Sequence, residues 1–161
     1  MIWFRALSFI VAVQLTVLVG VPWLLADVGP HMQLGLWHWL GIVPLAIGAL
    51  ALLWCNWAFV TRGRGTAAPY DPPRALVVQG LYRYVRNPMY VSAILIVMGI
   101  VLWTGAASLF VYSLLLALSY QLFVRCYEEP HLRRVFGQSY AEYCAAVPRW
   151  WPRVTPWPSD R

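Results

Sequence analysis

The stretch PMYVSAILIVMGIVLW (residues 88–103), followed by TG (104–105) and AASLFVYSLLLALSYQLFV (106–124), decides the fold. It holds two apolar segments without a single Asp, Glu, Lys or Arg, and only Thr104 and Gly105 separate them. A helix rises about 1.5 Å per residue, so each segment approaches the roughly 30 Å thickness of a bilayer's hydrocarbon core. We therefore expect a tight hairpin of two membrane-spanning helices, from Pro88 to Trp103 and from Ala106 to about Val124.

Two more apolar segments precede the hairpin, from Trp3 to Leu25 and from Leu36 to Phe59. Of the 161 residues, 61% are hydrophobic and only 11% are charged, whereas about a quarter of the residues of a soluble domain are charged. So few charges cannot cover a surface that faces water. We predict an all-α integral membrane protein, a single domain over residues 1–161 with four transmembrane helices. Two of them lie in residues 1–60, and the hairpin lies within a second half at 74–152.

The basic residues fix the expected orientation. All twelve are arginines, and none lies in the connection 26–35 or in the turn at 104–105. They lie instead in the connection 60–87, in the tail after Val124 and at Arg5. The positive-inside rule then places both termini in the cytoplasm, as suits the inner (plasma) membrane of a prokaryote. The net charge of +6 comes from arginines that lie beside apolar spans, where they can contact anionic lipid headgroups. We therefore expect no nucleic-acid partner.

The tail after the hairpin begins with an amphipathic helix. Its apolar residues share one face with arginines opposite, so we expect the helix to lie at the membrane interface. The residues of that face are Leu132, Val135, Phe136, Tyr140 and Tyr143. The helix is followed by Val147-Pro-Arg-Trp-Trp-Pro152, which its two prolines mark as a strap that turns back along the interface.

The two inner ends of the hairpin must be neighbours, because the hairpin starts and ends on the same side of the membrane. Gly80–Tyr90 leads in and Arg125–Glu129 leads out, so aromatic and charged side chains converge at the membrane boundary. Polar groups at that depth are candidates for function. Asn87 and Pro88 are typical of a helix N-cap and a first helical position, and the free N–H groups of such a helix start attract a carboxylate or phosphate.

The charged residues of this cluster have specific expected roles. Arg86 and Arg125 suit a carboxylate or phosphate on a substrate. Glu129 is placed to take a proton from an ammonium substrate. Glu129 also has a structural alternative, which is an ion pair with Arg133 one helical turn later.

Three blocks of this half carry a specific motif. It reads Gly80-x-Tyr82-xxx-Arg86-Asn87-Pro88-x-Tyr90, then Glu128-Glu129-xx-Leu132-xxx-Phe136-Gly137-xx-Tyr140-xx-Tyr143, then Val147-Pro148-Arg149. In spacing and order it resembles the isoprenylcysteine carboxyl methyltransferase and phospholipid methyltransferase family, over roughly residues 74–152. The resemblance implies a membrane methyltransferase that uses S-adenosyl-L-methionine. Its lipophilic acceptor would enter from the bilayer at the cytoplasmic face.

The resemblance also implies roles for individual residues. The cofactor is expected to lie between the inner ends of the hairpin and the tail, held by Arg74, Ala75, Leu76, Val77, Tyr82, Asn87, Pro88, Met89, Tyr90 and Glu128. Arg125 is the nearest match to a substrate-contacting arginine of the family, and with Arg86 and Glu129 it completes the expected catalytic residues. The family usually has His where this chain has Asn87. Asparagine can cap a helix and bind ligands but cannot act as an acid or base.

Several alternatives stay open on the sequence alone. The expected acceptor is the carboxylate of a prenylated cysteine, with a phospholipid amine, an isoprenoid or a small thiol as alternatives. Two other classes are an NADPH-dependent sterol-type membrane reductase and a non-catalytic lipid-binding protein. We expect no metal site, because His31 and His38 lie near the outer interface and the three cysteines lack ligand spacing. The sequence does not determine the oligomeric state.

Overall fold

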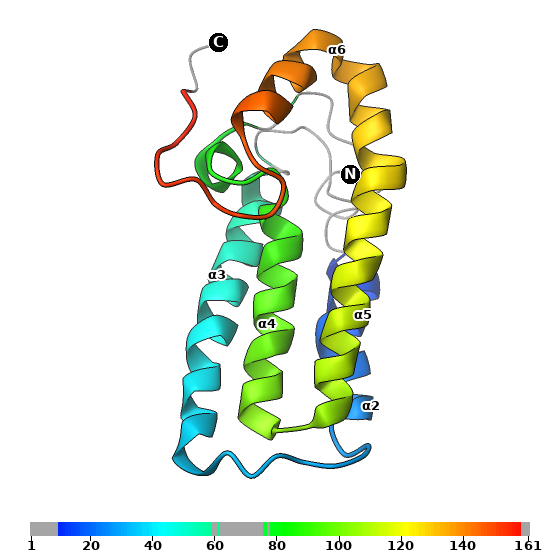
Figure 1. The fold of residues 1–161 in the computed structure, drawn as a ribbon, viewed down its shortest axis with the longest axis vertical. Helices are drawn as coiled ribbons and strands as arrows, with labels where there is room; N and C mark the ends of the chain where they lie inside the picture. The colour runs from blue at the N-terminus through cyan, green and yellow to red at the C-terminus, as the bar shows by residue number, and fades with distance from the viewer. Residues whose placement is uncertain (1–9, 59–60, 62–75, 77, 159–161) are drawn as a thin grey trace.

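The structure, a computed structural model, describes residues 10–58, 61, 76 and 78–158. This part of the chain is helical and contains no strand, and Figure 1 shows its long helices running upright in a bundle. The elements in order are η1 (Ile10–Gly20), α2 (Val21–Leu25), η2 (Gly35–Gly41), α3 (Ile42–Ala58), η4 (Gly80–Arg83), α4 (Pro88–Thr104), α5 (Ala107–Phe123), η5 (Val124–Glu128) and α6 (Glu129–Ala146). The predicted all-α fold is confirmed for these residues.

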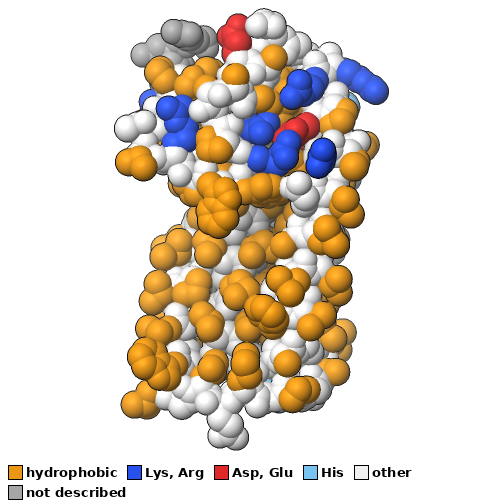
Figure 2. Space-filling model, viewed as in Figure 1, with side chains coloured by type: hydrophobic (Ala, Val, Ile, Leu, Met, Phe, Trp, Pro, Cys, Tyr) orange, Lys and Arg blue, Asp and Glu red, His pale blue; other side chains and the backbone are white. Residues whose placement is uncertain are grey.

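Within the described residues the four apolar segments form helices of different length, while the predicted bounds at Trp3 and Phe59 lie outside the described residues. Two helical runs are long and apolar enough to cross a membrane, namely Gly35–Ala58 and Ala107–Ala146. The first consists of η2 and α3, and the apolar part of the second is α5. Ala12–Leu25 and Pro88–Thr104 are apolar but shorter. Large apolar side chains are exposed along α3 and α5, and Figure 2 shows such side chains covering the lower part of the molecule. The described chain thus has two candidate membrane spans by length and composition.

Helices α3 and α4 pack at a distance that only glycine permits. A Cβ atom on Gly41 would lie 2.5 Å from the carbonyl oxygen of Gly99, and one on Gly48 would lie 2.7 Å from that of Ser92. Small residues allow two helix backbones to approach closely, which is a common way of joining helices in membranes. This contact holds α4 against α3 and thereby sets the position of the N-terminal end of α4.

The other end of α4 forms the tight turn at the bottom of Figure 1. Gly105 has the left-handed conformation there, with φ of 70°, which a residue with a Cβ atom adopts only under strain. The N–H of Met32 donates to the carbonyl of Gly105 at 2.8 Å, and the N–H of Ala107 donates to that of Pro30 at 3.1 Å. The structure thus joins α4 and α5 in a tight hairpin, with its turn at Gly105 and Ala106, one residue later than predicted.

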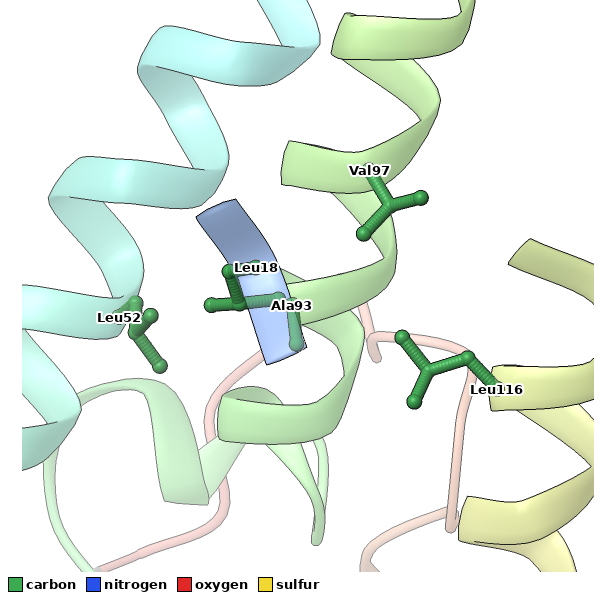
Figure 3. Packing of buried hydrophobic residues seen from close by; sticks show 5 residues of the cluster. All are labelled: Leu18, Leu52, Ala93, Val97 and Leu116. Carbon is green, nitrogen blue, oxygen red and sulfur yellow. The ribbon is translucent and has the colours of Figure 1, made fainter. Parts of the chain in front are cut away.

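The N-terminal helix shares one core with the other helices. Tyr112 of α5 donates its hydroxyl to the carbonyl of Val17 at 2.8 Å, and Ser108 donates to that of Leu25 at 2.7 Å. Buried side chains from η1, α3, α4 and α5 meet between the helices, as Figure 3 shows for Leu18, Leu52, Ala93, Val97 and Leu116. These contacts fix the four apolar helices relative to one another.

Beyond α5 the chain continues through η5 into α6, which crosses the upper end of the bundle in Figure 1. Helix α6 bends sharply at Gly137 (φ 54°, ψ −125°), and this bend interrupts the helical periodicity. The face expected to lie on the membrane is therefore split. Val135, before the bend, is 55% exposed, whereas Tyr140 and Tyr143, after it, are buried. The residues that pack against this buried part include Leu76, Val78, Leu132, Phe136 and Trp157.

Candidate functional site at the charged end of the bundle

Charged side chains gather at one end of the molecule, above the apolar part in Figure 2. Three segments meet there, namely the start of α4 with η4, the passage from η5 into α6, and residues 147–158, which we call the strap. Arg86 contacts Glu129 and Tyr90 contacts Glu128. The predicted convergence of residues 80–90 with 125–129 is thus found in the structure.

Glu129 is held between two arginines, in what we call the clasp Arg86–Glu129–Arg149. Arg149 donates through Nε to Oε1 at 2.6 Å and through Nη2 to Oε2 at 2.9 Å, and Arg86 Nη1 lies 3.1 Å from Oε1. The Glu129 side chain is only 9% exposed. Burial opposes its ionisation, but the Arg149 hydrogen bonds and the charges of Arg86 and Arg149 outweigh burial and lower the pKa of Glu129. Glu129 is therefore a carboxylate with both oxygens engaged.

The strap is fastened to the segment before α4 by its backbone. The N–H of Arg86 donates to the carbonyl of Pro148 at 2.9 Å, and the N–H of Arg153 donates to that of Tyr84 at 2.9 Å. Such long-range backbone pairs satisfy polar groups that neither segment satisfies within itself. The strap thus turns back, as its prolines predicted, and lies beside the start of α4.

Asn87 lies at the N-cap position of α4 but does not cap it as predicted. Its side chain makes no cap hydrogen bond, and its Nδ2 instead donates to the carbonyl of Arg149 at 3.2 Å. The strap passes close enough for its carbonyl to take the donor, which the local sequence of α4 does not reveal. Pro88 is the first residue of α4, as predicted. The first-turn N–H groups of Met89 and Tyr90 consequently have no cap from Asn87.

Glu128 has a different environment from its neighbour Glu129. Tyr90 Oη donates to Glu128 Oε2 at 2.8 Å, while Oε1 accepts no hydrogen bond from the described residues. Burial and the charge of Glu129 raise the pKa of Glu128, although the Tyr90 hydrogen bond lowers it. A half-buried carboxyl group with a free oxygen and a raised pKa has the properties of a proton acceptor.

Aromatic rings gather around Tyr90. The ring of Tyr120, in the last turn of α5, lies 4.6 Å from that of Tyr90 between centroids, and the ring of Trp150 in the strap lies 6.5 Å away. The indole N–H of Trp150 donates to Gln121 Oε1 at 2.7 Å, which orients the indole. We call Tyr90, Tyr120 and Trp150 the aromatic box. It brings together α4, α5 and the strap next to Glu128.

The protein-family model described as phospholipid methyltransferase matches residues 36–139, more than half of the chain. The chain belongs to the phospholipid methyltransferase family. The match confirms the resemblance carried by the motif residues. It begins in η2 and ends in α6, so it takes in the α4–α5 hairpin, Tyr90, Glu128 and Glu129.

Curated proteins similar to this family member include three fungal phosphatidylethanolamine N-methyltransferases. That of Schizosaccharomyces pombe is 36% identical over 64 residues, 40% of this chain. Those of Yarrowia lipolytica and Aspergillus terreus are 30% and 33% identical over 43% and 44% of this chain. Each match spans 7% of the relative's own length. No solved structure matches the chain. Fungal relatives lend no support to the expected prokaryotic membrane.

In this phospholipid methyltransferase family member, the other predicted site residues lie around the cluster. Tyr82 is buried and its carbonyl accepts a hydrogen bond from the Tyr143 hydroxyl at 2.7 Å. Met89 packs against the core, and Leu76 packs against α6. Arg125 is exposed and makes no ion pair within the described chain, so it stands apart from the clasp. Three predicted cofactor residues, Arg74, Ala75 and Val77, lie outside the described residues.

Some members of the site were missed on the sequence. The partner of Glu129 is Arg149 in place of Arg133, which is exposed and acts on Glu129 only through its charge. Tyr120 lies eight residues before Glu128, and this spacing places two residues on one helical face. The helical periodicity could therefore have identified Tyr120 as a neighbour of the site. No spacing rule relates Trp150 to α5, since the strap has no regular secondary structure.

The described residues contain no group of three or more His, Cys, Asp or Glu side chains that could hold a metal ion. His31 and His38 each bond to a nearby backbone carbonyl, those of Ala26 and Gly35. Neither histidine contacts the clasp or the aromatic box.

Proposed function

We propose that this protein transfers a methyl group from S-adenosyl-L-methionine to the amine of a phospholipid at the charged end of its bundle. Membership of the phospholipid methyltransferase family and the fungal relatives named phosphatidylethanolamine N-methyltransferase support this acceptor. Of the acceptors left open by the sequence, they favour the phospholipid amine over the prenylated cysteine carboxylate.

The amine acceptor is favoured by which charged side chains already have partners. A carboxylate acceptor needs a free arginine, but Arg86 and Arg149 are both engaged with Glu129, and Arg125 is exposed outside the cluster. An ammonium acceptor needs a free carboxyl group, and Glu128 Oε1 is free within the described residues. The single decisive observation is thus that one acid of the pair is fully engaged while its neighbour has a free oxygen.

We also propose Glu128, in place of Glu129, as the group that takes the acceptor's proton. A protonated amine has no lone pair for attack, so the ammonium must lose a proton before it can accept a methyl group. Both oxygens of Glu129 accept hydrogen bonds from Arg149, and its lowered pKa makes it a weak base. The raised pKa of Glu128 suits a base that works near neutral pH. The family resemblance assigned Glu128 to the cofactor, and this proposal assigns it to the acceptor.

The residues at the start of α4 fit the cofactor. S-adenosyl-L-methionine carries a carboxylate, which the uncapped N–H groups and positive dipole end of α4 favour. Tyr82, Asn87, Pro88, Met89 and Tyr90 would hold it, together with Leu76, which packs against α6. When bound, the cofactor supplies a methyl group on a sulfonium. The protein aligns the acceptor and keeps water away.

The proposed topology has four transmembrane helices with both termini in the cytoplasm. Helix α4 has 17 residues and reaches about 26 Å at 1.5 Å per residue, a little short of the bilayer core. The charged end of the bundle then lies at the boundary between hydrocarbon and headgroups, where the headgroup of a phospholipid also lies. The cytoplasmic placement of that end follows from the arginines.

The test uses the full chain in nanodiscs that contain phosphatidylethanolamine, with cofactor labelled in its methyl group. We expect labelled N-methylated phospholipid, and at least a 100-fold loss of product in Glu128→Gln. Glu142→Gln, an exposed acid of α6, is the matched control and should retain activity. S-adenosylhomocysteine should bind to both variants. Label recovered only in added farnesylcysteine, or binding of NADPH alone, would overturn the proposal.

A further inference from the structure

The aromatic box is centred on Tyr90, which has the rings of Tyr120 and Trp150 beside it and the carboxyl group of Glu128 at its hydroxyl. Tyr90 comes from the first turn of α4, Tyr120 from the last turn of α5 and Trp150 from the strap. All three side chains are half-buried, as is Glu128. The box therefore keeps part of its surface accessible, at the level where the apolar part of the bundle gives way to the charged part.

Two hydrogen bonds hold this group in place. Tyr90 is fixed by its bond to Glu128, and Trp150 is fixed by its bond to Gln121. Both bonds use the polar edge of the ring and leave the π-face free of that bond. The rings are thus oriented before any ligand binds, which lowers the entropic cost of binding.

Aromatic faces next to a carboxylate favour one ligand chemistry. A methylated ammonium group is a cation with an apolar surface, and it is attracted to the faces of Trp and Tyr within about 6 Å. Each added methyl group removes an N–H donor, so hydrogen bonding to the headgroup weakens as methylation proceeds. Attraction to aromatic faces does not depend on those donors and persists.

We infer that Tyr90, Tyr120 and Trp150 form the subsite that binds the acceptor as an alkylammonium cation, with Glu128 as the countercharge until it takes the proton, and that the rings retain the cation after methylation while Glu128 releases that proton to water. This inference rests on the proposed function, because it names the headgroup that the same site recognises. It assigns substrate-contacting roles to Tyr120 and Trp150, neither of which belongs to the family motif.

The sulfonium of the cofactor has the same onium chemistry, so the test needs two arms. The first arm compares a short-chain phosphatidylcholine with the isosteric lipid whose headgroup ends in an uncharged 3,3-dimethylbutyl group. We expect the full chain in detergent to bind the cationic lipid about tenfold more tightly, from the usual strength of a desolvated cation–π contact. The second arm compares the affinity for S-adenosylmethionine with that for S-adenosylhomocysteine, which differ in the sulfonium charge.

Matched variants separate recognition from packing. Trp150→Leu and Tyr120→Leu should bring the lipid ratio close to one and leave the ratio of the two adenosyl compounds unchanged. Tyr120→Phe keeps the ring and should keep the lipid ratio. Trp151→Leu is the control, because the neighbouring Trp151 is 84% exposed and lies outside the box. Retained binding of S-adenosylhomocysteine shows that each variant is folded.

The outcomes distinguish the two proposals. A wild-type lipid ratio of one, with S-adenosylhomocysteine bound, would overturn the aromatic subsite and leave the methyltransferase proposal standing. A change of the adenosyl ratio in the Leu variants, with an unchanged lipid ratio, would overturn the subsite in favour of sulfonium binding. Failure of the wild-type protein to bind S-adenosylhomocysteine would overturn the proposed function itself.

Discussion

The two ends of the α4–α5 hairpin are closed in opposite ways. At the turn end, Gly105 in its left-handed conformation and two backbone hydrogen bonds, Met32 to Gly105 and Ala107 to Pro30, close the hairpin. At the charged end, the side chains of Arg86, Glu129 and Arg149 do so. The first end depends on backbone geometry and backbone hydrogen bonds, and the second depends on side chains from three segments far apart in sequence.

The difference shows where the molecule can carry chemistry. At the turn end, His31 pairs with Ala106 and the ring of His38 lies 5.1 Å from that of Trp103, and each histidine bonds to a backbone carbonyl. At the charged end, the clasp engages Glu129 completely and holds the strap, which in turn places Trp150 beside Tyr90 and Glu128. The structural acid and the free acid are adjacent in sequence, and only their partners separate their roles.

The largest effect should come from breaking the clasp. Glu129→Ala leaves the largely buried Arg86 and the partly exposed Arg149 as neighbouring charges without a counterion, and removing one partner of a fully buried ion pair costs up to about 3–5 kcal/mol. We expect a clear fall in the melting temperature of the purified protein, followed by tryptophan fluorescence, and a loss of methyl transfer because the strap and Trp150 are no longer held in place.

Arg134→Ala is the control for this variant, because Arg134 is exposed on the same helix and forms no ion pair in the described chain. It should melt like the wild type. Equal melting temperatures for Glu129→Ala and Arg134→Ala would show that the clasp does not hold the strap.

A change at the turn end should cost less stability than breaking the clasp and should leave cofactor binding intact. Gly105→Ala places a Cβ atom at a positive φ and against the backbone of Met32, so we expect about 1–3 kcal/mol of destabilisation. The affinity for S-adenosylhomocysteine, measured by titration calorimetry, should stay within twofold of wild type.

Gly29→Ala separates the two causes of that destabilisation. Gly29 also has a positive φ, 84°, but nothing lies within 4 Å of its Cβ position. It should therefore cost less than Gly105→Ala. A loss of cofactor affinity in Gly105→Ala as large as the loss of stability would contradict the separation of the two ends.

The sequence predicts this molecule well wherever one continuous segment determines the result. Helix α4 starts at Pro88 as expected, because its apolar run and its proline are local signals. The encounter of residues 80–90 with 125–129 also follows, because a two-residue turn leaves the chain no other course. These predictions need no knowledge of distant contacts.

Prediction fails where a distant segment competes with a local partner. Helix spacing offers Arg133 to Glu129 and a cap role to Asn87, yet the strap supplies Arg149 to Glu129 and accepts the amide of Asn87. The path of the strap depends on tertiary contacts such as that of Trp157 with the buried part of α6. No local pattern encodes that path, so the aromatic box could not be assembled from the sequence.

The smallest effect concerns the free acid. Tyr90→Phe keeps the ring of the aromatic box and removes the hydroxyl that donates to Glu128. That hydrogen bond favours the ionised carboxylate and lowers its pKa, so its loss should raise the pKa of Glu128 further. A bond worth about 1 kcal/mol corresponds to somewhat less than one pH unit. Since the base works only when ionised, the acid limb of the pH dependence of kcat/KM should shift upward by about that amount. Activity on the high-pH plateau should change little.

Tyr112→Phe, which loses a hydroxyl remote from the site, should leave the limb in place. An acid limb that does not move in Tyr90→Phe would mean that ionisation of Glu128 does not control methyl transfer.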